Sequence, residues 1–274
     1  MKHIANAVPS EEISFNNVQL KTGVRLQYAE RGKRDGEVII FLHGYTDSWY
    51  SFSTILSLLS TEYHTISLTQ RGHGDSDKPN SYNFNNFAAD VEAFMNELGI
   101  EKATIVGHSM GSFIAQRVAI NYADRVKRLV LIGSAPSAIN NEGINEFQEV
   151  VASLEDPIDK EFVREFQSST LHNPVPEEFL EKVVSESMKV PARVWKEALA
   201  ELGKIDHYDQ LRQINLPTLI VWGDHDDFFT REDQETLANL IPNPTLKLYE
   251  KAGHGTHWEK PQKFVDDLEE FMRL

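Results

Sequence analysis

The sequence contains no cysteine among its 274 residues. The chain therefore cannot form disulfides, and it offers neither a thiolate nucleophile nor a thiolate metal ligand. It also has no apolar run near the ~20 residues that a bilayer-spanning helix needs. Residues 1–10 contain no apolar segment of signal-peptide length. We therefore expect a cytoplasmic protein without a membrane-spanning segment.

Basic residues are scarce relative to acidic ones. Lysine and arginine total 27 against 42 aspartate and glutamate residues, which gives a formal net charge of −15. Nucleic acids and anionic lipid surfaces attract clustered lysine and arginine side chains, so this balance argues against both as partners. The acidic excess is instead typical of a surface that keeps a protein soluble.

The order of apolar segments predicts an α/β fold. Strand-like segments occur at 13–20, 24–28, 38–42, 64–68, 103–106, 128–132, 218–222 and 245–249. The first two alternate like an antiparallel hairpin, and helical periodicity separates most of the others. Continuous apolar strands that alternate with helices are typical of a parallel sheet covered on both faces. The pattern predicts a mostly parallel eight-stranded sheet.

The stretch from 136 to 215 interrupts this pattern. Strand-like runs vanish there, and apolar residues recur at helical spacing among many acids. Four prolines divide the stretch into several short helices: Pro157, Pro174, Pro176 and Pro191. We predict an inserted helical cap at 136–215, and a core domain formed by 1–135 together with 216–274.

The segment from 103 to 111 combines an apolar run, a sharp turn and the start of a helix. The turn reads Gly107-His108-Ser109-Met110-Gly111. A G-x-S-x-G turn between strand and helix holds its serine in a strained backbone conformation, with glycines where Cβ atoms do not fit. The N–H groups at the start of the helix then point toward whatever the serine attacks. Ser109 is therefore a candidate nucleophile.

A serine hydroxyl needs a base to take its proton, and the base needs an acid to orient it. Candidates for both roles follow the last two predicted strands: Asp224, Asp226 and Asp227, then His254 and His257. The carboxyl ends of parallel strands meet at one edge of the sheet, so these groups are expected to converge on Ser109.

Five motifs follow one another along the chain. They are HG at 43–44, RGHGDS at 71–76, GHSMG at 107–111, WGDHD at 222–226 and GHGTHWEKP at 253–261. With these motifs, the whole sequence apart from the cap resembles the α/β-hydrolase superfamily, in the branch of cap-bearing bacterial serine esterases and related hydrolases. The resemblance implies an α/β-hydrolase fold.

The resemblance also implies a catalytic triad. It assigns Ser109 as the nucleophile and His254, directly after a glycine, as the base, with His257 as the chief rival. The pattern G-x-x-D assigns Asp226 as the orienting acid. Some relatives carry this acid after the preceding strand, but residues 133–136 of this chain contain none.

Other motif residues are expected to support the site. The resemblance places an oxyanion hole at the backbone N–H groups of Tyr45 and Met110. His108 is expected to pack beneath the loops, and Arg71, His73 and Asp75 in the motif 71–76 are expected to brace the edge of the site. Relatives commonly carry an acid where this chain has Thr69, so local hydrogen bonding there is expected to differ.

These assignments predict a hydrolase of a carboxylic ester or lactone that works through an acyl-enzyme. This reaction requires no metal or organic cofactor. His254 and His257 form an H-x-x-H pair, but it lies in a loop without the matching acid or cysteine set of a metal site. We expect a small-molecule ester or lactone as the partner, and a monomer or homodimer. Haloalkane dehalogenases and epoxide hydrolases of this fold attack with an aspartate, so Ser109 argues against both activities.

Three alternatives stay open on the sequence. A carbon-carbon bond hydrolase of meta-cleavage products, or a cofactor-free perhydrolase, would use the same triad. A ligand receptor on a hydrolase scaffold is a third. The cap sets the substrate, and its aromatic residues Phe147, Phe166 and Trp195 either line an apolar pocket or attach the cap to the core.

Overall fold

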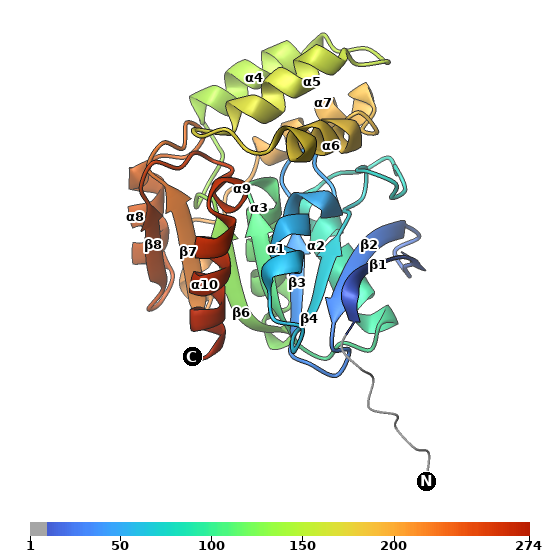
Figure 1. Cartoon of the computed structure of the whole chain (residues 1–274). Helices are drawn as coiled ribbons and strands as arrows, with labels where there is room; N and C mark the ends of the chain where they lie inside the picture. The colour runs from blue at the N-terminus through green and yellow to red at the C-terminus, as the bar shows by residue number, and fades with distance from the viewer. Residues whose placement is uncertain (1–9) are drawn as a thin grey trace.

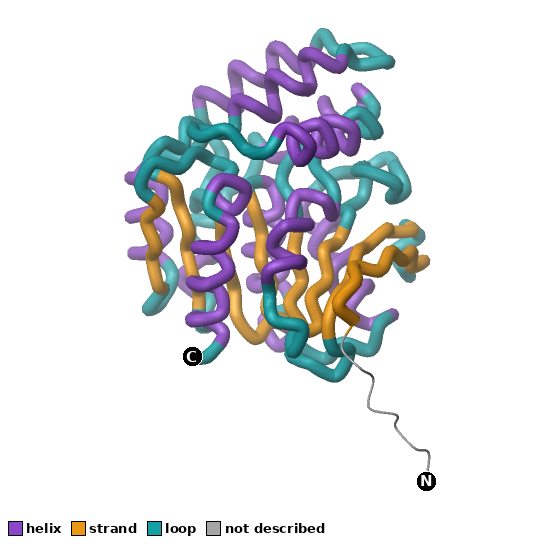
Figure 2. The backbone as a smooth tube through the Cα atoms, viewed as in Figure 1, coloured by secondary structure: helices purple, strands orange, loops and turns teal. Residues whose placement is uncertain are grey.

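The computed structural model describes residues 10–274, and the expectation that no signal segment opens the chain concerns residues outside this range. One sheet has the strand order β1-β2-β4-β3-β5-β6-β7-β8 (Figures 1 and 2). The strands are β1 Ser10–Gln19, β2 Arg25–Gly32, β3 Val38–Leu42, β4 His64–Leu68, β5 Ala103–His108, β6 Val126–Ile132, β7 Thr218–Gly223 and β8 Thr245–Tyr249. Strand β2 is antiparallel to both β1 and β4, and every other pair is parallel. The predicted eight-stranded, mostly parallel sheet is confirmed.

Helices cover both faces of the sheet (Figure 1). In β3, Ile39 and Phe41 face one cluster of buried side chains, and Ile40 and Leu42 face the other. Alternate side chains of a strand point to opposite faces, so a strand buried on both sides reads as one apolar run. The covering helices are α1 Ser53–Leu58 and α10 Pro261–Met272 on the first face, with α2 Phe84–Glu97, α3 Met110–Asn121 and α8 Arg231–Leu240 on the second.

The chain leaves the sheet after β6 and returns at β7. Four helices lie between these strands: α4 Glu142–Ala152, α5 Lys160–Ser169, α6 Glu177–Ser187 and α7 Ala192–Leu202. Ser137 pairs with Asp206 in an antiparallel bridge, so the outgoing and returning segments lie side by side. The four helices sit over the edge where the parallel strands end (Figure 1). We call residues 136–215 the cap.

The short helical elements depart from the sequence expectations. The apolar pattern that begins at Trp49 starts as a 3₁₀ turn, η1 Trp49–Phe52, because the Ser48 hydroxyl accepts a hydrogen bond from the Tyr50 N–H and fixes a tight first turn. The segment after β8, which carries His254 and His257, contains an additional helix, α9 Thr256–Glu259. Two further 3₁₀ turns are η2 Ala123–Arg125 and η3 Leu211–Gln213. Across residues 10–274, none of the helices combines the length and apolar character required to cross a membrane.

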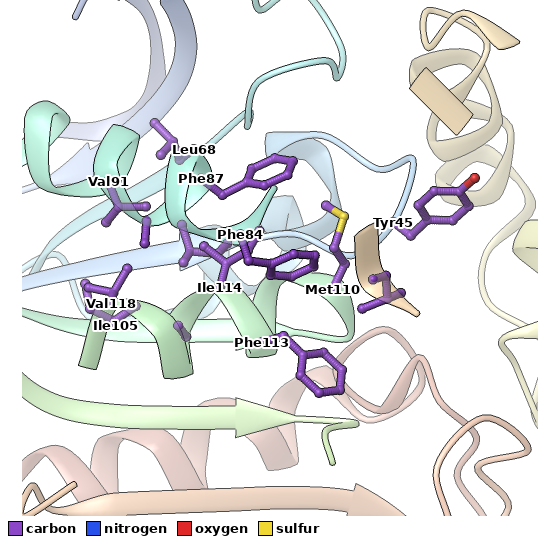
Figure 3. Packing of buried hydrophobic residues seen from close by; sticks show 14 of the residues in the cluster. Tyr45, Leu68, Phe84, Phe87, Val91, Ile105, Met110, Phe113, Ile114 and Val118 are labelled. Carbon is purple, nitrogen blue, oxygen red and sulfur yellow. The ribbon is translucent and has the colours of Figure 1, made fainter. Parts of the chain in front are cut away.

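The turn that carries Ser109 rests on a tightly packed part of the core. Phe113 and Ile114 of α3 are fully buried, as is Ile105 of β5, and Phe87 of α2 packs beside them (Figure 3). Burying an apolar side chain of this size stabilises a fold by about 1.5 to 3 kcal/mol. This packing fixes α3 against the sheet, so the turn between β5 and α3 has a rigid support.

Candidate active site

Ser109 occupies the turn between β5 and α3 with φ 52° and ψ −122°. Residues other than glycine rarely adopt positive φ, and such strain persists only where the surroundings enforce it. A Cβ atom on Gly107 would lie 2.2 Å from the carbonyl oxygen of Gly111, and one on Gly111 would lie 2.1 Å from that of Leu42. Both flanking positions therefore require glycine, as the sequence predicts.

His254 and Asp226 meet at the ends of the last two strands. The His254 Nδ1–H donates to Asp226 Oδ2 at 2.8 Å, and both side chains are buried. The other carboxylate oxygen of Asp226 accepts from the backbone N–H groups of Phe228 and Phe229, at 2.8 and 3.1 Å. These bonds hold the carboxylate in place, and the bond to Nδ1 leaves Nε2 as the basic nitrogen of His254.

Ser109 and His254 line the same cavity, which lies between the core and the cap. Its volume is about 40 Å³, which is room for a few water molecules. Most of the lining is apolar and comes from both the core and the cap. The core contributes Gly44, Tyr45, Asp47, His108, Ser109, Phe228, Phe229, His254 and Trp258, and the cap contributes Gly143, Ile144, Phe147, Phe166, Gln167, Thr170, Leu199 and Leu202.

The two backbone donors that the resemblance implies are placed near the nucleophile. Tyr45 follows β3 and lines the cavity, and Met110 is the first residue of α3. Within residues 10–274, neither of these N–H groups donates to another protein group. The first N–H groups of a helix have no partner inside the helix, so that of Met110 is available to a ligand.

A buried acid, Asp47, lines the cavity and was not singled out in the sequence. Its Oδ1 accepts from Gln167 Nε2 at 3.1 Å, and its Oδ2 accepts from the Ser51 hydroxyl at 3.3 Å. Burial raises the pKa of Asp47 to about 7, against the lowering effect of these two bonds and of nearby His254. The only sequence signal is its position three residues after Gly44 of the HG motif.

His254 and His257, the two histidines after β8, have different surroundings. His257 is fully buried and its ring stacks on Phe52 with centroids 4.6 Å apart, while its Nε2 lies 3.4 Å from the Ser51 hydroxyl oxygen. Burial lowers the pKa of His257 to about 3, so this ring stays neutral. His108 Nε2–H donates to the carbonyl oxygen of His254 at 3.1 Å, which places His108 beneath the loop as expected.

Known proteins share this arrangement of sheet, turn and loops. The family model described as alpha/beta hydrolase fold matches residues 37–261. The chain belongs to the α/β-hydrolase fold family. It is 24% identical over 266 residues to epoxide hydrolase 4 of Mus musculus, covering 86% of this chain and 72% of that protein. It is 28% identical over 281 residues to a non-heme chloroperoxidase of Streptomyces lividans, covering 94% of this chain and 100% of that protein.

A solved structure shares the fold of this α/β hydrolase. An esterase from Exiguobacterium antarcticum has a TM-score of 0.85 and 24% sequence identity, with 94% of this chain and 99% of that chain covered. At this identity the likeness shows the fold and does not show the reaction.

The RGHGDS motif of this α/β hydrolase forms hydrogen bonds behind the cavity. Arg71 forms two bonds of 2.7 Å with Asp90 of α2, and both side chains are buried. His73 Nδ1 lies 2.8 Å from the carbonyl oxygen of Arg71, and Asp75 forms an ion pair of 2.7 Å with Lys189 of the cap. Thr69 accepts a hydrogen bond from the Trp49 N–H at 3.1 Å. The motif thus connects the core, the site loops and the cap.

The three cap aromatics have different positions in this α/β hydrolase. Phe147 and Phe166 line the cavity and stack on each other, with centroids 4.9 Å apart and planes 11° apart. Trp195 lies outside the lining, fully buried, with its ring 5.3 Å from that of Tyr45. Phe147 and Phe166 therefore line the apolar cavity, whereas Trp195 attaches the cap to the core.

A second, open cleft of about 650 Å³ lies at the opposite edge of the sheet, where β3 and β4 begin. Its lining mixes acids and bases, among them Glu30, Arg34 and His64, and includes no serine. His64 Nε2 lies 2.8 Å from Glu30 Oε2, so this pair is already satisfied within the core. The smaller cavity, which Ser109 and His254 line, is the candidate active site.

Proposed function

We propose that this α/β hydrolase is a serine hydrolase that cleaves a carboxylic ester or lactone through an acyl-enzyme. The observation that carries the proposal is that Ser109 lines the same mostly apolar cavity as His254, whose ring is oriented by its hydrogen bond to Asp226. Such an arrangement activates a hydroxyl that is otherwise a poor nucleophile. The cavity lining also favours a substrate whose acyl part is apolar.

The proposed reaction starts with attack by the Ser109 hydroxyl oxygen on the carbonyl carbon. His254 Nε2 takes the hydroxyl proton, and the carbonyl oxygen becomes an oxyanion that the N–H groups of Tyr45 and Met110 stabilise. Each such donor lowers a barrier by about 3 kcal/mol. His254 then gives its proton to the departing alkoxide oxygen, which stays on the acyl chain when the substrate is a lactone.

Water completes the cycle. It enters beside His254, which removes its proton while the oxygen attacks the acyl carbon of the ester formed with Ser109. The second tetrahedral intermediate collapses as His254 returns the proton to the serine oxygen. A carboxylic acid is released, and Asp226 supports the imidazolium in both halves of the reaction without itself taking the proton.

The charge of the cavity favours a neutral ester over a ring-cleavage product. Among the described residues that line it, there is no lysine or arginine, and Asp47 supplies an acid. The product of meta-cleavage carries a carboxylate, and a buried anion without a partner is costly. An ester or lactone that is uncharged around the reacting carbonyl meets no such penalty.

The test is hydrolysis of p-nitrophenyl esters from acetate to decanoate by the intact protein and by a Ser109→Ala variant. We expect activity that rises and then falls with acyl length and that is lost in the variant. The acyl length of the best substrate would indicate the length of the part of the cavity that holds the acyl chain. No ester or lactone hydrolysis by an intact, folded protein would contradict the proposal and favour the carbon-carbon hydrolase or the receptor.

Perhydrolysis is a second candidate, favoured by the relative named non-heme chloroperoxidase, which this chain matches over 94% of its length. Hydrogen peroxide would take the place of water in the second half-reaction and release a peracid from the acyl-enzyme. Peracid formation from an acetate ester and peroxide, compared with hydrolysis of the same ester, separates the two activities. Peracid as the main product would assign perhydrolysis.

A further inference from the structure

The loop 43–48, which joins β3 to η1 and carries Tyr45, is fixed at both ends by the core. Gln70 Nε2 donates to the carbonyl oxygen of His43 at 2.8 Å. At the other end, the N–H of Trp49 donates to Thr69 Oγ1 at 3.1 Å. Both partners belong to the segment after β4. The ends of the loop are therefore held by core residues and not by the cap.

The middle of the same loop also bonds to the cap. Gln167 of α5 is 1% exposed, and its Nε2 lies 3.2 Å from Thr46 Oγ1 and 3.1 Å from Asp47 Oδ1. The same nitrogen lies 2.8 Å from the hydroxyl oxygen of Ser187 in α6. One amide group thus joins two cap helices to the two residues that follow Tyr45.

Tyr45 itself has a second attachment to the cap. Its hydroxyl donates to the carbonyl oxygen of Trp195 at 2.6 Å, and its ring meets that of Phe166 edge-on with centroids 5.8 Å apart. Thr46, next in the chain, has φ 64°, a conformation that β-branched residues rarely adopt. A strained residue of this kind keeps its conformation only while its neighbours enforce it.

We propose that Gln167 is a positioning residue for the oxyanion hole, which is complete only when the cap is closed. By holding Thr46 and Asp47, the amide aims the Tyr45 N–H at the carbonyl oxygen of the substrate. This inference rests on the proposed function, because it needs a reaction that develops an oxyanion. It adds a cap residue, more than fifty positions from either backbone donor, to the groups on which turnover depends.

The size of the cavity makes this coupling part of each catalytic cycle. The cavity has room for a few water molecules, and eight of the residues that line it belong to the cap, so we expect the cap to shift when substrate enters. Opening withdraws Gln167 from the loop, and closing restores it. The N–H of Tyr45 is then aligned after the substrate is enclosed, so hydrolysis is favoured for substrates over which the cap can close.

The test compares two glutamine variants of the cap. Gln167→Met keeps the length of the side chain and removes its hydrogen bonds. Gln148→Met is the matched control, because Gln148 Nε2 donates to the carbonyl oxygen of Leu199 at 3.2 Å and so bonds only within the cap. We expect Gln167→Met to lower kcat by about 10- to 100-fold, with KM changed less than about threefold. We expect the control to keep kcat within about twofold.

The affinities of two inhibitors test directly whether Gln167 supports the oxyanion hole. A trifluoromethyl ketone that carries the acyl chain of one ester of the p-nitrophenyl series adds to Ser109 and places an oxyanion in the hole. The amide analogue of the same ester binds with a planar carbonyl group. We expect Gln167→Met to weaken the ketone by the factor by which it lowers kcat, and to leave the affinity of the amide unchanged. Thermal melting of both variants verifies that they are folded at the assay temperature.

The proposal would be overturned by an unchanged kcat in Gln167→Met, with or without a rise in KM, or by an equal loss of ketone and amide affinity. An equal loss of kcat in both glutamine variants would also overturn it, because the effect would then belong to the cap as a whole. Ketone binding needs no turnover. Tight ketone binding that depends on Gln167, in a protein that hydrolyses no ester, would refute the proposed substrate and retain the role of Gln167.

Discussion

Gly133, the residue that follows β6, has no room for a side chain beside His254 and Asp226. A Cβ atom there would lie 2.9 Å from His254 Nδ1, 3.0 Å from its Cε1 and 3.4 Å from Asp226 Oδ2. The first two distances are shorter than ordinary carbon contacts by about 0.5 Å. Gly133→Ala must therefore displace the imidazole or lengthen its bond to Asp226. Displacements of this order cost about 100-fold in rate.

The same substitution also strains the backbone, because Gly133 has φ 52°. An alanine with positive φ destabilises a fold by about 1 to 2 kcal/mol. Gly99→Ala is the matched control, since Gly99 has φ 67° and a Cβ atom there would meet nothing within 4 Å. We expect both variants to lose about 1 to 2 kcal/mol in urea unfolding, but only Gly133→Ala to lose about 100-fold in kcat/KM. Equal activities in the two variants would refute the assigned roles of His254 and Asp226.

Three further predictions concern buried ionisable groups. Burial raises the pKa of Asp47 to about 7 in the folded protein, so the unfolded state loses this proton first as pH rises from 4 to 7, and the fold is destabilised. In urea unfolding, Asp47→Asn should therefore stabilise the protein by about 2 to 4 kcal/mol at pH 8 and should not stabilise it below pH 4. The pKa of His257 is lowered to about 3, so the unfolded state binds the proton first as pH falls below 6.5. His257→Gln should remove about 1.4 kcal/mol per pH unit from the pH dependence of unfolding between pH 6 and 4, and an unchanged slope would contradict a buried neutral ring. Asp90→Ala leaves Arg71 buried without its partner and should cost about 3 to 5 kcal/mol in unfolding, while the folded fraction keeps its kcat; a large loss of kcat would assign the motif a direct catalytic part.

The parts of the site that could be predicted from sequence are those whose geometry follows from local rules. The turn at Ser109 is set by five consecutive residues, and Gly107 and Gly111 have the steric role that their spacing indicates. The meeting of Asp226 and His254 follows from the topology, because parallel strands end at one edge. Neither feature depends on how the cap packs.

The contacts between cap and core could not be predicted in the same way. Gln167 reaches Asp47 across 120 residues, and the amphipathic pattern of α5 does not show which loop its polar residues approach. The raised pKa of Asp47 depends on burial beneath that helix, so it could not be predicted either. His257 stacks on Phe52, far along the chain, because α9 turns its ring into the core. Tertiary packing decides all of these features.

The central claim, an acyl-enzyme on Ser109, can be tested by rapid-quench mass spectrometry. The protein is mixed with a p-nitrophenyl ester, stopped in acid within milliseconds to seconds, and digested. We predict that the peptide carrying Ser109 gains the mass of the acyl group, that the adduct appears with the burst of p-nitrophenol, and that Ser109→Ala shows neither. Turnover without any adduct, or an adduct on another residue, would contradict the role assigned to Ser109.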